Sequence, residues 1–225
     1  RRGVMSNKLL YGVGINDADY VVNRGVYLEE RHLNGKKKWI STWKCPYYTK
    51  WKSMIERCYS EKHQITNPAY KDVTVCEEWL TFSNFRKWMV SQPWQVKEGE
   101  SSLHLDKDIL LKGNKVYSPE ACVFVSRLVN NFINTNRGKN KSKYLLSCYW
   151  RENSNKFTSN CNSYFDNKVI HLGYFNTELE SHLAWKKQKH IYSCALADSE
   201  YVTDERVAEA LRNKYKNYTI YEEEL

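Results

Sequence analysis

The stretch LHLDKDILLKGNKVYSPEACVFVSRLVNNFINTNRGKN, residues 103–140, decides the fold of the central part of the chain. An alternating segment at 104–108 precedes a turn at 114–119, and a second apolar segment covers 120–125. Apolar residues then recur at helical spacing, and Asn130, Asn131 and Asn134 lie among them. This order predicts a strand, a turn, a second strand and a helix, which together form a ββα unit.

The segments before this unit predict an amphipathic helix, a short strand and a second helix. Residues 46–60 open with a proline and repeat large apolar groups at the spacing of one helix face. Residues 73–75 favour a strand, and Thr81 or Ser83 is suited to cap the helix that follows. The stripe that we expect this helix to bury is Phe82, Phe85, Trp88 and Met89. Such stripes are core packing far more often than ligand platforms.

The N-terminal part carries two β-prone stretches and a cationic segment. Residues 9–28 place an Asn-Asp-Ala-Asp turn between the two stretches, which predicts a short hairpin or an extended arm. An Asn-Gly turn at 34–35 is followed by three lysines at 36–38 and by Trp39. We expect a basic loop here, because a run of lysines is more often a solvated loop than a binding site.

Length, charge and cysteine content restrict the class of protein. The 225 residues suffice for one sizeable core or two small ones, and we favour two. Lys and Arg number 35 against 26 Asp and Glu, a net charge of +9 that indicates either a polyanionic partner or simply a soluble basic surface. The seven cysteines are odd in number and lack CxxC spacing, which favours buried thiols in a reducing cytosol over structural zinc. No apolar run reaches transmembrane length, so we expect no membrane association.

The pattern of apolar and polar residues changes after residue 142, in the C-terminal third of the sequence. Short alternating strands separated by turns at 152–155 and 166–167 predict a three-stranded antiparallel sheet. Thr177 and Glu180 form a capping-box pattern at the start of a helix that we expect to pack on this sheet. The apolar positions expected to face the core from that helix are Leu183, Ala184, Ile191 and Ala195.

These elements predict an α+β protein with three parts. Residues 1–138 form an N-terminal arm and the ββα region, and residues 139–200 form the sheet-and-helix module. Residues 201–225 add a last helix and an acidic tail, to which we assign no function. The expected apolar face of the last helix is Val207, Ala208, Leu211 and Tyr215.

Residues 45–136 resemble the HNH-endonuclease-like proteins of tailed phages and their hosts. The likeness is carried by LDKD at 105–108, GNKVYSP at 113–119 and CVFV at 122–125. It implies a degenerate HNH-like ββα core in which Mg²⁺ or another divalent metal neutralises charge on a scissile phosphate. The implied metal ligands are Asp106 on the strand and Asn131 on the helix, and Asn130 fits the helix position equally.

The sequence departs from the HNH pattern at residues that carry catalysis. The position after the strand aspartate, typically the general-base histidine, is Lys107, which is a poor proton acceptor between two aspartates. The Pro-Glu-Asn that usually opens the second strand is Pro-Glu-Ala at 119–121. His104 could act as the base instead, although we favour a structural role for it. The candidate catalytic residues are Asp106, Lys107, Asp108, His104 and Asn131. The alternative for the aspartates and Lys107 is a salt-bridged strand end that only preserves the fold.

Residues 144–198 resemble the plant APETALA-type, ethylene-response DNA-binding domain, a three-stranded sheet packed on one helix. The likeness is carried by YWRENSNKFTSN at 149–160, HLGYF at 171–175 and NTELESHLAW at 176–185, although the usual opening Gly-Val is here Ser-Cys. The resemblance implies a sheet that meets bases and phosphates in the major groove. The matched positions that contact DNA in that family are Trp150, Arg151, Lys156 and Thr158. Polar and cationic residues beside them extend the candidate DNA-binding set with Lys143, Asn160, Lys168 and His171.

We therefore expect a phage-type, double-stranded DNA-binding protein of the bacterial host cytoplasm that resembles homing endonucleases. Two functional classes remain open. The first is an endonuclease that cleaves or nicks DNA with a divalent metal. The second is a catalytically inactive protein without a cofactor, which acts by occupying DNA or a host or phage protein. An RNA-binding protein is a third alternative.

Overall fold

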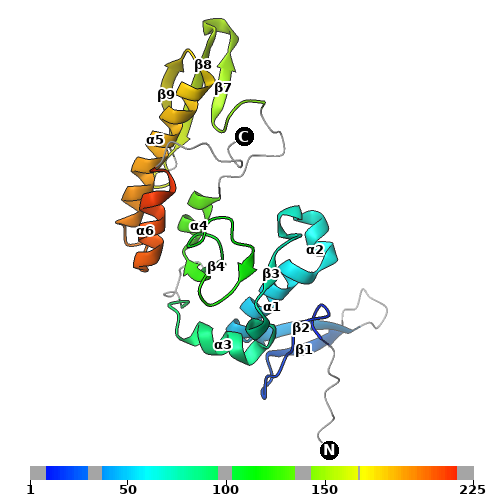
Figure 1. The fold of residues 1–225 in the computed structure, drawn as a ribbon. Helices are drawn as coiled ribbons and strands as arrows, with labels where there is room; N and C mark the ends of the chain where they lie inside the picture. The colour runs from blue at the N-terminus through cyan, green and yellow to red at the C-terminus, as the bar shows by residue number, and fades with distance from the viewer. Residues whose placement is uncertain (1–8, 30–36, 96–102, 135–142, 167, 217–225) are drawn as a thin grey trace, which may run out of the picture. The chain divides into compact units, whose positions relative to one another are not determined.

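The computed structural model describes residues 9–29, 37–95, 103–134, 143–166 and 168–216 (Figure 1). Helices and strands are mixed along the chain, which agrees with the predicted α+β class. The chain divides into two compact units, one made of residues 1–95 and 105–124 and the other of residues 96–104 and 125–225. We call them the first unit and the second unit.

The first unit contains a β-hairpin. β1 (Asn23–Glu29) pairs antiparallel with β2 (Lys37–Lys44). The prediction that the two stretches of residues 9–28 pair with each other is therefore wrong, and the predicted basic loop is in part a strand. Local alternation identifies a strand but not its partner, because pairing depends on residues outside the window. Residues 10 and 14 form an isolated bridge in a tight turn instead.

The core of the first unit lies between two helices. α1 (Pro46–Tyr59) and α3 (Phe82–Val90) pack together, and α2 (Glu61–Thr66) follows α1. Short 3-10 turns cover Pro68–Tyr70 and Glu77–Leu80. Of the stripe predicted for α3, Phe82, Phe85 and Met89 are buried and Trp88 is half-buried.

The central segment is built from short strands and one helix. β4 (His104–Asp106) pairs with β6 (Val123–Val125), and α4 (Arg127–Ile133) follows. The first predicted strand is too long, because Lys107 and Asp108 lie in a bend after β4. β5 (Val116–Tyr117) was expected to be part of the turn and instead pairs in parallel with β3 (Thr74–Val75).

The second unit contains a three-stranded antiparallel sheet with a long helix along one side (Figure 1). The strands are β7 (Cys148–Arg151), β8 (Lys156–Asn162) and β9 (Val169–Phe175), with a 3-10 turn at Glu152–Ser154. α5 (Glu178–Ala197) begins at a complete Thr177 and Glu180 capping box. α6 (Glu205–Lys214) packs on α5 and buries the four apolar residues predicted for it.

The buried face of α5 differs from the prediction. Of the four apolar positions expected to face the core, Leu183 and Ala184 are half-buried, while Ile191 and Ala195 are exposed. The buried residues are Ser181, His182, Trp185, Lys186, Lys189, Ser193, Leu196 and Ala197. Polar side chains are tolerated there because several find partners, such as the Ser193 hydroxyl, which donates to the Leu211 carbonyl at 2.7 Å.

The two units divide inside β6, whereas the sequence places a boundary at residue 138. The reason is that α4 packs with the C-terminal elements: the ring of Phe132 lies 4.8 Å from that of Tyr164. All seven cysteines are free thiols and five of them are buried, in accord with the expected small apolar role. No helix within the described ranges has the length and hydrophobicity needed to cross a lipid bilayer.

Candidate nucleic-acid interface

The strand register sorts the side chains of β7–β9 into two faces. Trp150 lies opposite Phe157, and Phe157 lies opposite Phe175. Cys148 alternates with Trp150 and lies 3.4 Å from the Glu178 carbonyl of α5, so this row faces the helix. The other row forms a surface that we call the outer face. Its residues are Tyr149, Arg151, Lys156, Thr158, Asn160, His171 and Tyr174.

Two cations lie directly opposite each other on the outer face. Arg151 of β7 pairs in register with Lys156 of β8, and both side chains are exposed. Within the described ranges neither of them has a carboxylate partner. Like charges opposite each other in a sheet are mutually unfavourable. An anion bound between them would relieve this repulsion, so this pair of cations is suited to a phosphate.

Hydrogen-bonding and aromatic groups lie beside these cations. A bulge between Ser159 and Asn160 brings His171 opposite Asn160, and the His171 Nδ1 lies 3.3 Å from the Asn160 Oδ1. The His171 ring also lies 5.1 Å from that of Tyr174, which is 58% exposed. Tyr149 is 48% exposed on the same face. The outer face therefore combines charge, amide and imidazole groups, and exposed rings.

The predicted DNA-binding residues do not all share this face. The Trp150 ring lies on the helix face, edge-on to Phe157 at 4.9 Å. Thr158 is on the outer face but only 2% exposed, and its hydroxyl donates to the Gly173 carbonyl at 3.0 Å. Both residues therefore support the sheet, and we leave them out of the proposed contact set. The exposed Tyr149 and Tyr174 are not among the predicted contact residues. The sequence does show that Tyr149 lies two positions from Arg151, on the same face, and that Tyr174 is next to Phe175 and therefore points to the opposite face.

Two further predicted cations lie outside the strands. Lys168 forms an ion pair with Asp166 at 3.2 Å in the turn before β9. The Lys143 ammonium lies 5.0 Å from the centre of the Tyr144 ring, just before β7. Both are exposed and could add to the attraction for a polyanion. Lys168 already has a carboxylate partner, so we expect it to contribute less than Arg151 and Lys156.

Asp106, the central predicted ligand, accepts two backbone hydrogen bonds. The N–H groups of Asp108 and Ile109 donate to its Oδ1 at 2.9 and 2.8 Å. Asp106 as a whole is 8% exposed. Burial and the nearby charge of Asp108 raise the pKa of Asp106 above its ordinary value, and the two N–H bonds oppose this rise. Asp106 therefore organises the turn that follows β4.

Lys107 is also tied into this turn. Its ammonium donates to the Asp108 carboxylate at 2.9 Å and to the Asn114 carbonyl at 3.0 Å. The Asn114 amide in turn donates to the Lys107 carbonyl at 2.6 Å. A protonated amine that donates two hydrogen bonds is not placed to accept a proton from water. These contacts support the alternative of a salt-bridged strand end.

The remaining predicted catalytic residues lie on β4 and α4. His104 is half-buried at the start of β4, and Asn131 is exposed on α4 of the second unit. A divalent ion needs several oxygen or nitrogen ligands. In the part of the chain that the structure describes, no group of three or more His, Cys, Asp or Glu side chains is arranged to supply them. Within the described residues, Asp106 is therefore not part of such a group.

The role of Asp106 can be tested by two substitutions. We expect Asp106→Ala to lower the free energy of unfolding by about 1–2 kcal/mol, because two N–H groups lose their acceptor. Asp106→Asn keeps an oxygen at the same place and should lower it by about 0.5 kcal/mol or less. Urea denaturation followed by tryptophan fluorescence measures both, with Glu77→Gln, at an exposed carboxylate outside this turn, as control. Equal losses for the two Asp106 variants would contradict this role.

A scan against protein-family models and searches of curated proteins and solved structures found no match for this chain. The likeness to HNH-endonuclease-like and APETALA-type proteins therefore depends on sequence motifs alone. The geometry of the outer face must support the functional conclusion.

Proposed function

We propose that this protein binds double-stranded DNA through the outer face of β7–β9. The observation that supports the proposal most directly is the cross-strand pair of Arg151 and Lys156, exposed and without a carboxylate partner within the described ranges. Such a pair is suited to the closely spaced phosphates of a duplex. The net charge of +9 favours the same partner at longer range.

Each group on the outer face has a separate role in this proposal. Arg151 and Lys156 contact phosphates and fix the position of the sheet on the duplex. Asn160 and His171 offer hydrogen bonds to base edges, which carry the sequence information of the major groove. Tyr149 and Tyr174 supply apolar contact with sugars and thymine methyl groups. α5 holds the sheet from the other side, so the face is already formed before DNA binds.

Titration of fluorescently labelled duplex DNA with the full chain tests this proposal. We expect the double variant Arg151→Ala/Lys156→Ala to bind about tenfold more weakly than the natural chain, because two phosphate contacts are lost. Lys187→Ala removes an exposed lysine of α5, away from the outer face, and serves as the matched control. Unchanged binding by the double variant, or tighter binding of the natural chain to duplex RNA, would refute the proposal.

We further propose that the protein acts by occupying DNA rather than by cutting it. Two observations support this: Asp106 accepts hydrogen bonds from its own turn, and Lys107 donates to Asp108 and Asn114. A plasmid-nicking assay with Mg²⁺ or Mn²⁺ should show no metal-dependent product. Nicking that Asp106→Asn abolishes would instead establish the endonuclease.

A further inference from the structure

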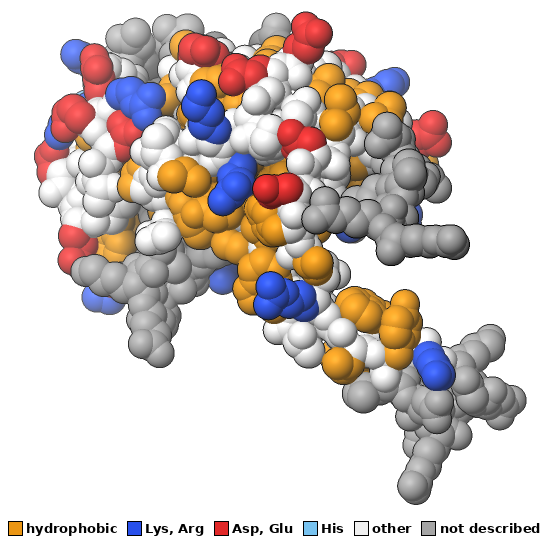
Figure 2. All heavy atoms as spheres, turned by 90° about the horizontal axis from the view of Figure 1, so that it is seen from below, with side chains coloured by type: hydrophobic (Ala, Val, Ile, Leu, Met, Phe, Trp, Pro, Cys, Tyr) orange, Lys and Arg blue, Asp and Glu red, His pale blue; other side chains and the backbone are white. Residues whose placement is uncertain are grey.

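The hairpin of β1 and β2 exposes large apolar side chains on both of its faces. Within the described elements its extensive contacts are between its own two strands. Tyr27 is 65% exposed, Val26 49% and Trp43 43%. Figure 2 shows hydrophobic and Lys or Arg side chains mixed along the arm that ends in grey residues. A two-stranded hairpin with so much exposed apolar surface is marginal alone, so we expect it to have a partner.

One face of this hairpin presents a platform of rings. Tyr27 pairs in register with Trp39, and the two rings meet edge to face at 4.8 Å. Gly25 permits this arrangement, because a methyl group there would lie 2.6 Å from the Trp39 ring and would also collide with the Ile40 carbonyl oxygen. The Trp39 ring is thus held over the backbone while 41% of the residue stays exposed. A ring fixed in this way is suited to stacking.

Cations accompany the rings along the hairpin. The Arg24 guanidinium lies 5.3 Å from the centre of the Trp43 ring. Lys37 and Lys38 are exposed at the start of β2, and Lys44 is exposed at its end. Alternation of exposed rings with cations is typical of surfaces that bind single-stranded nucleic acid, where bases stack on rings and phosphates meet cations.

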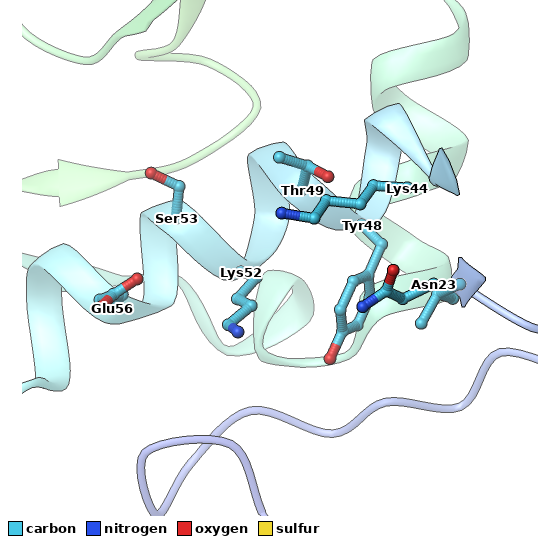
Figure 3. Close-up of a pocket in the computed structure, with 8 residues that line it drawn as sticks. Asn23, Lys44, Tyr48, Thr49, Lys52, Ser53 and Glu56 are labelled. Atoms are coloured by element: carbon cyan, nitrogen blue, oxygen red, sulfur yellow. The ribbon is translucent and has the colours of Figure 1, made fainter. Parts of the chain in front are cut away.

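A pocket of about 280 Å³ lies where the hairpin meets α1 (Figure 3). Asn23 and Lys44 line it from the hairpin, and Tyr48, Lys52 and Glu56 line it from α1. Neither lysine has an ion pair within the described ranges. The two ammonium groups outnumber the single Glu56 carboxylate, so the pocket lining has a net positive charge that suits a phosphodiester at this end of the platform.

We propose that the hairpin and this pocket form a second nucleic-acid surface, which binds single-stranded DNA. Exposed rings on a hairpin can stack on unpaired bases, whereas the bases of a duplex are already stacked on each other. The choice of DNA over RNA rests on the proposed function. The surface itself does not, because it belongs to the first unit and shares no residue with the outer face.

Titration of the full chain with a fluorescent oligothymidylate of about 20 nucleotides tests this surface. We expect salt-sensitive binding that Trp39→Ala weakens about tenfold, with Trp39→Phe within about threefold of the natural chain. The double variant Lys44→Gln/Lys52→Gln should also weaken oligothymidylate binding about tenfold. It leaves the packing of the rings intact, so the test still holds if the hairpin fails to fold in Trp39→Ala. Lys62→Ala, an exposed lysine of α2, is the control.

The outcomes separate this surface from the outer face. Arg151→Ala/Lys156→Ala should bind the oligothymidylate as the natural chain does, even if duplex binding proves absent. No binding of the natural chain at about 50 mM salt, or full binding by both hairpin variants, would refute the single-strand surface. Tighter binding to oligouridylate, or binding to anionic lipid vesicles but not to the oligothymidylate, would also overturn it.

Discussion

Trp51→Ala is expected to lower the free energy of unfolding of the first unit by about 3–5 kcal/mol. Trp51 is completely buried, and its indole N–H donates to the Trp79 carbonyl at 2.7 Å. Its ring lies 5.5 Å from Phe82 and closes against the backbone of Gly14. The substitution therefore removes a large apolar volume and leaves a buried carbonyl without its donor.

Hydrogen exchange by mass spectrometry measures this effect where it occurs. Peptides from Pro46–Tyr59 should exchange faster in Trp51→Ala, whereas peptides from Glu178–Ala197 should not change. Trp51→Phe keeps most of the side-chain volume, so it should lower the free energy of unfolding by only about 1–2 kcal/mol. Protection of α1 equal to that of the natural chain would show that Trp51 is not central to this core.

Because of Lys189, the free energy of unfolding is expected to rise with pH between about pH 8 and 10. Lys189 is 3% exposed, and its ammonium donates to the Tyr164 hydroxyl at 3.0 Å. It lies 3.9 Å from the centre of the Phe132 ring and 5.9 Å from that of Tyr215. Burial, with a smaller effect of Lys214, lowers the pKa of Lys189 to about 8, and Cys161 opposes the change. The rings also favour the charged form and offset part of the desolvation.

The difference in stability between the natural chain and Lys189→Met isolates this titration. In the unfolded chain a lysine keeps its proton until about pH 10.4, so between pH 8 and 10 unfolding takes up a proton. Across this interval the free energy of unfolding of the natural chain should therefore rise by about 1–3 kcal/mol relative to that of Lys189→Met. Below pH 8 the difference between the two free energies should be constant. Other titrating groups, including Cys161, are present in both proteins.

Lys187→Met supplies the matched control for this measurement, because Lys187 is exposed on the same helix. Its stability relative to the natural chain should not vary between pH 7 and 10. Guanidinium denaturation at each pH gives both differences. If the free energy of unfolding of the natural chain relative to Lys189→Met stays constant or falls as pH rises, the pKa of Lys189 is not lowered by burial.

Local signals in the sequence predicted parts of three helices correctly, whereas α2 was not predicted. Proline at the first position and a regular apolar stripe placed α1 within one residue of its observed end. The capping box of α5 and the apolar face of α6 were also predicted correctly. In these cases the information lies within a few turns of the element itself.

The remainder of the fold depends on contacts distant in sequence. Nothing in residues 23–29 specifies pairing with 37–44, and nothing near Val116 specifies β3 as its partner. The face that α5 buries was missed because Lys189 is satisfied by rings from outside that helix. An apolar pattern cannot show that a lysine has found such surroundings.

The candidate site was predicted in part. The family resemblance supplied Arg151 and Lys156, and the polar and cationic residues beside them supplied Asn160 and His171. The structure places all four on the outer face. Strand alternation shows that Trp150 cannot share a face with Arg151, because neighbours on a strand point to opposite sides. At Asp106, motif spacing identified the residue but not the hydrogen bonds that occupy it.

The salt dependence of duplex binding tests the central claim most directly. We expect the logarithm of the association constant of the full chain to fall linearly with the logarithm of salt concentration, as phosphate neutralisation requires. In Arg151→Ala/Lys156→Ala the slope should be shallower by about 2. An affinity independent of salt, or an identical slope in the double variant, would contradict DNA binding by the outer face.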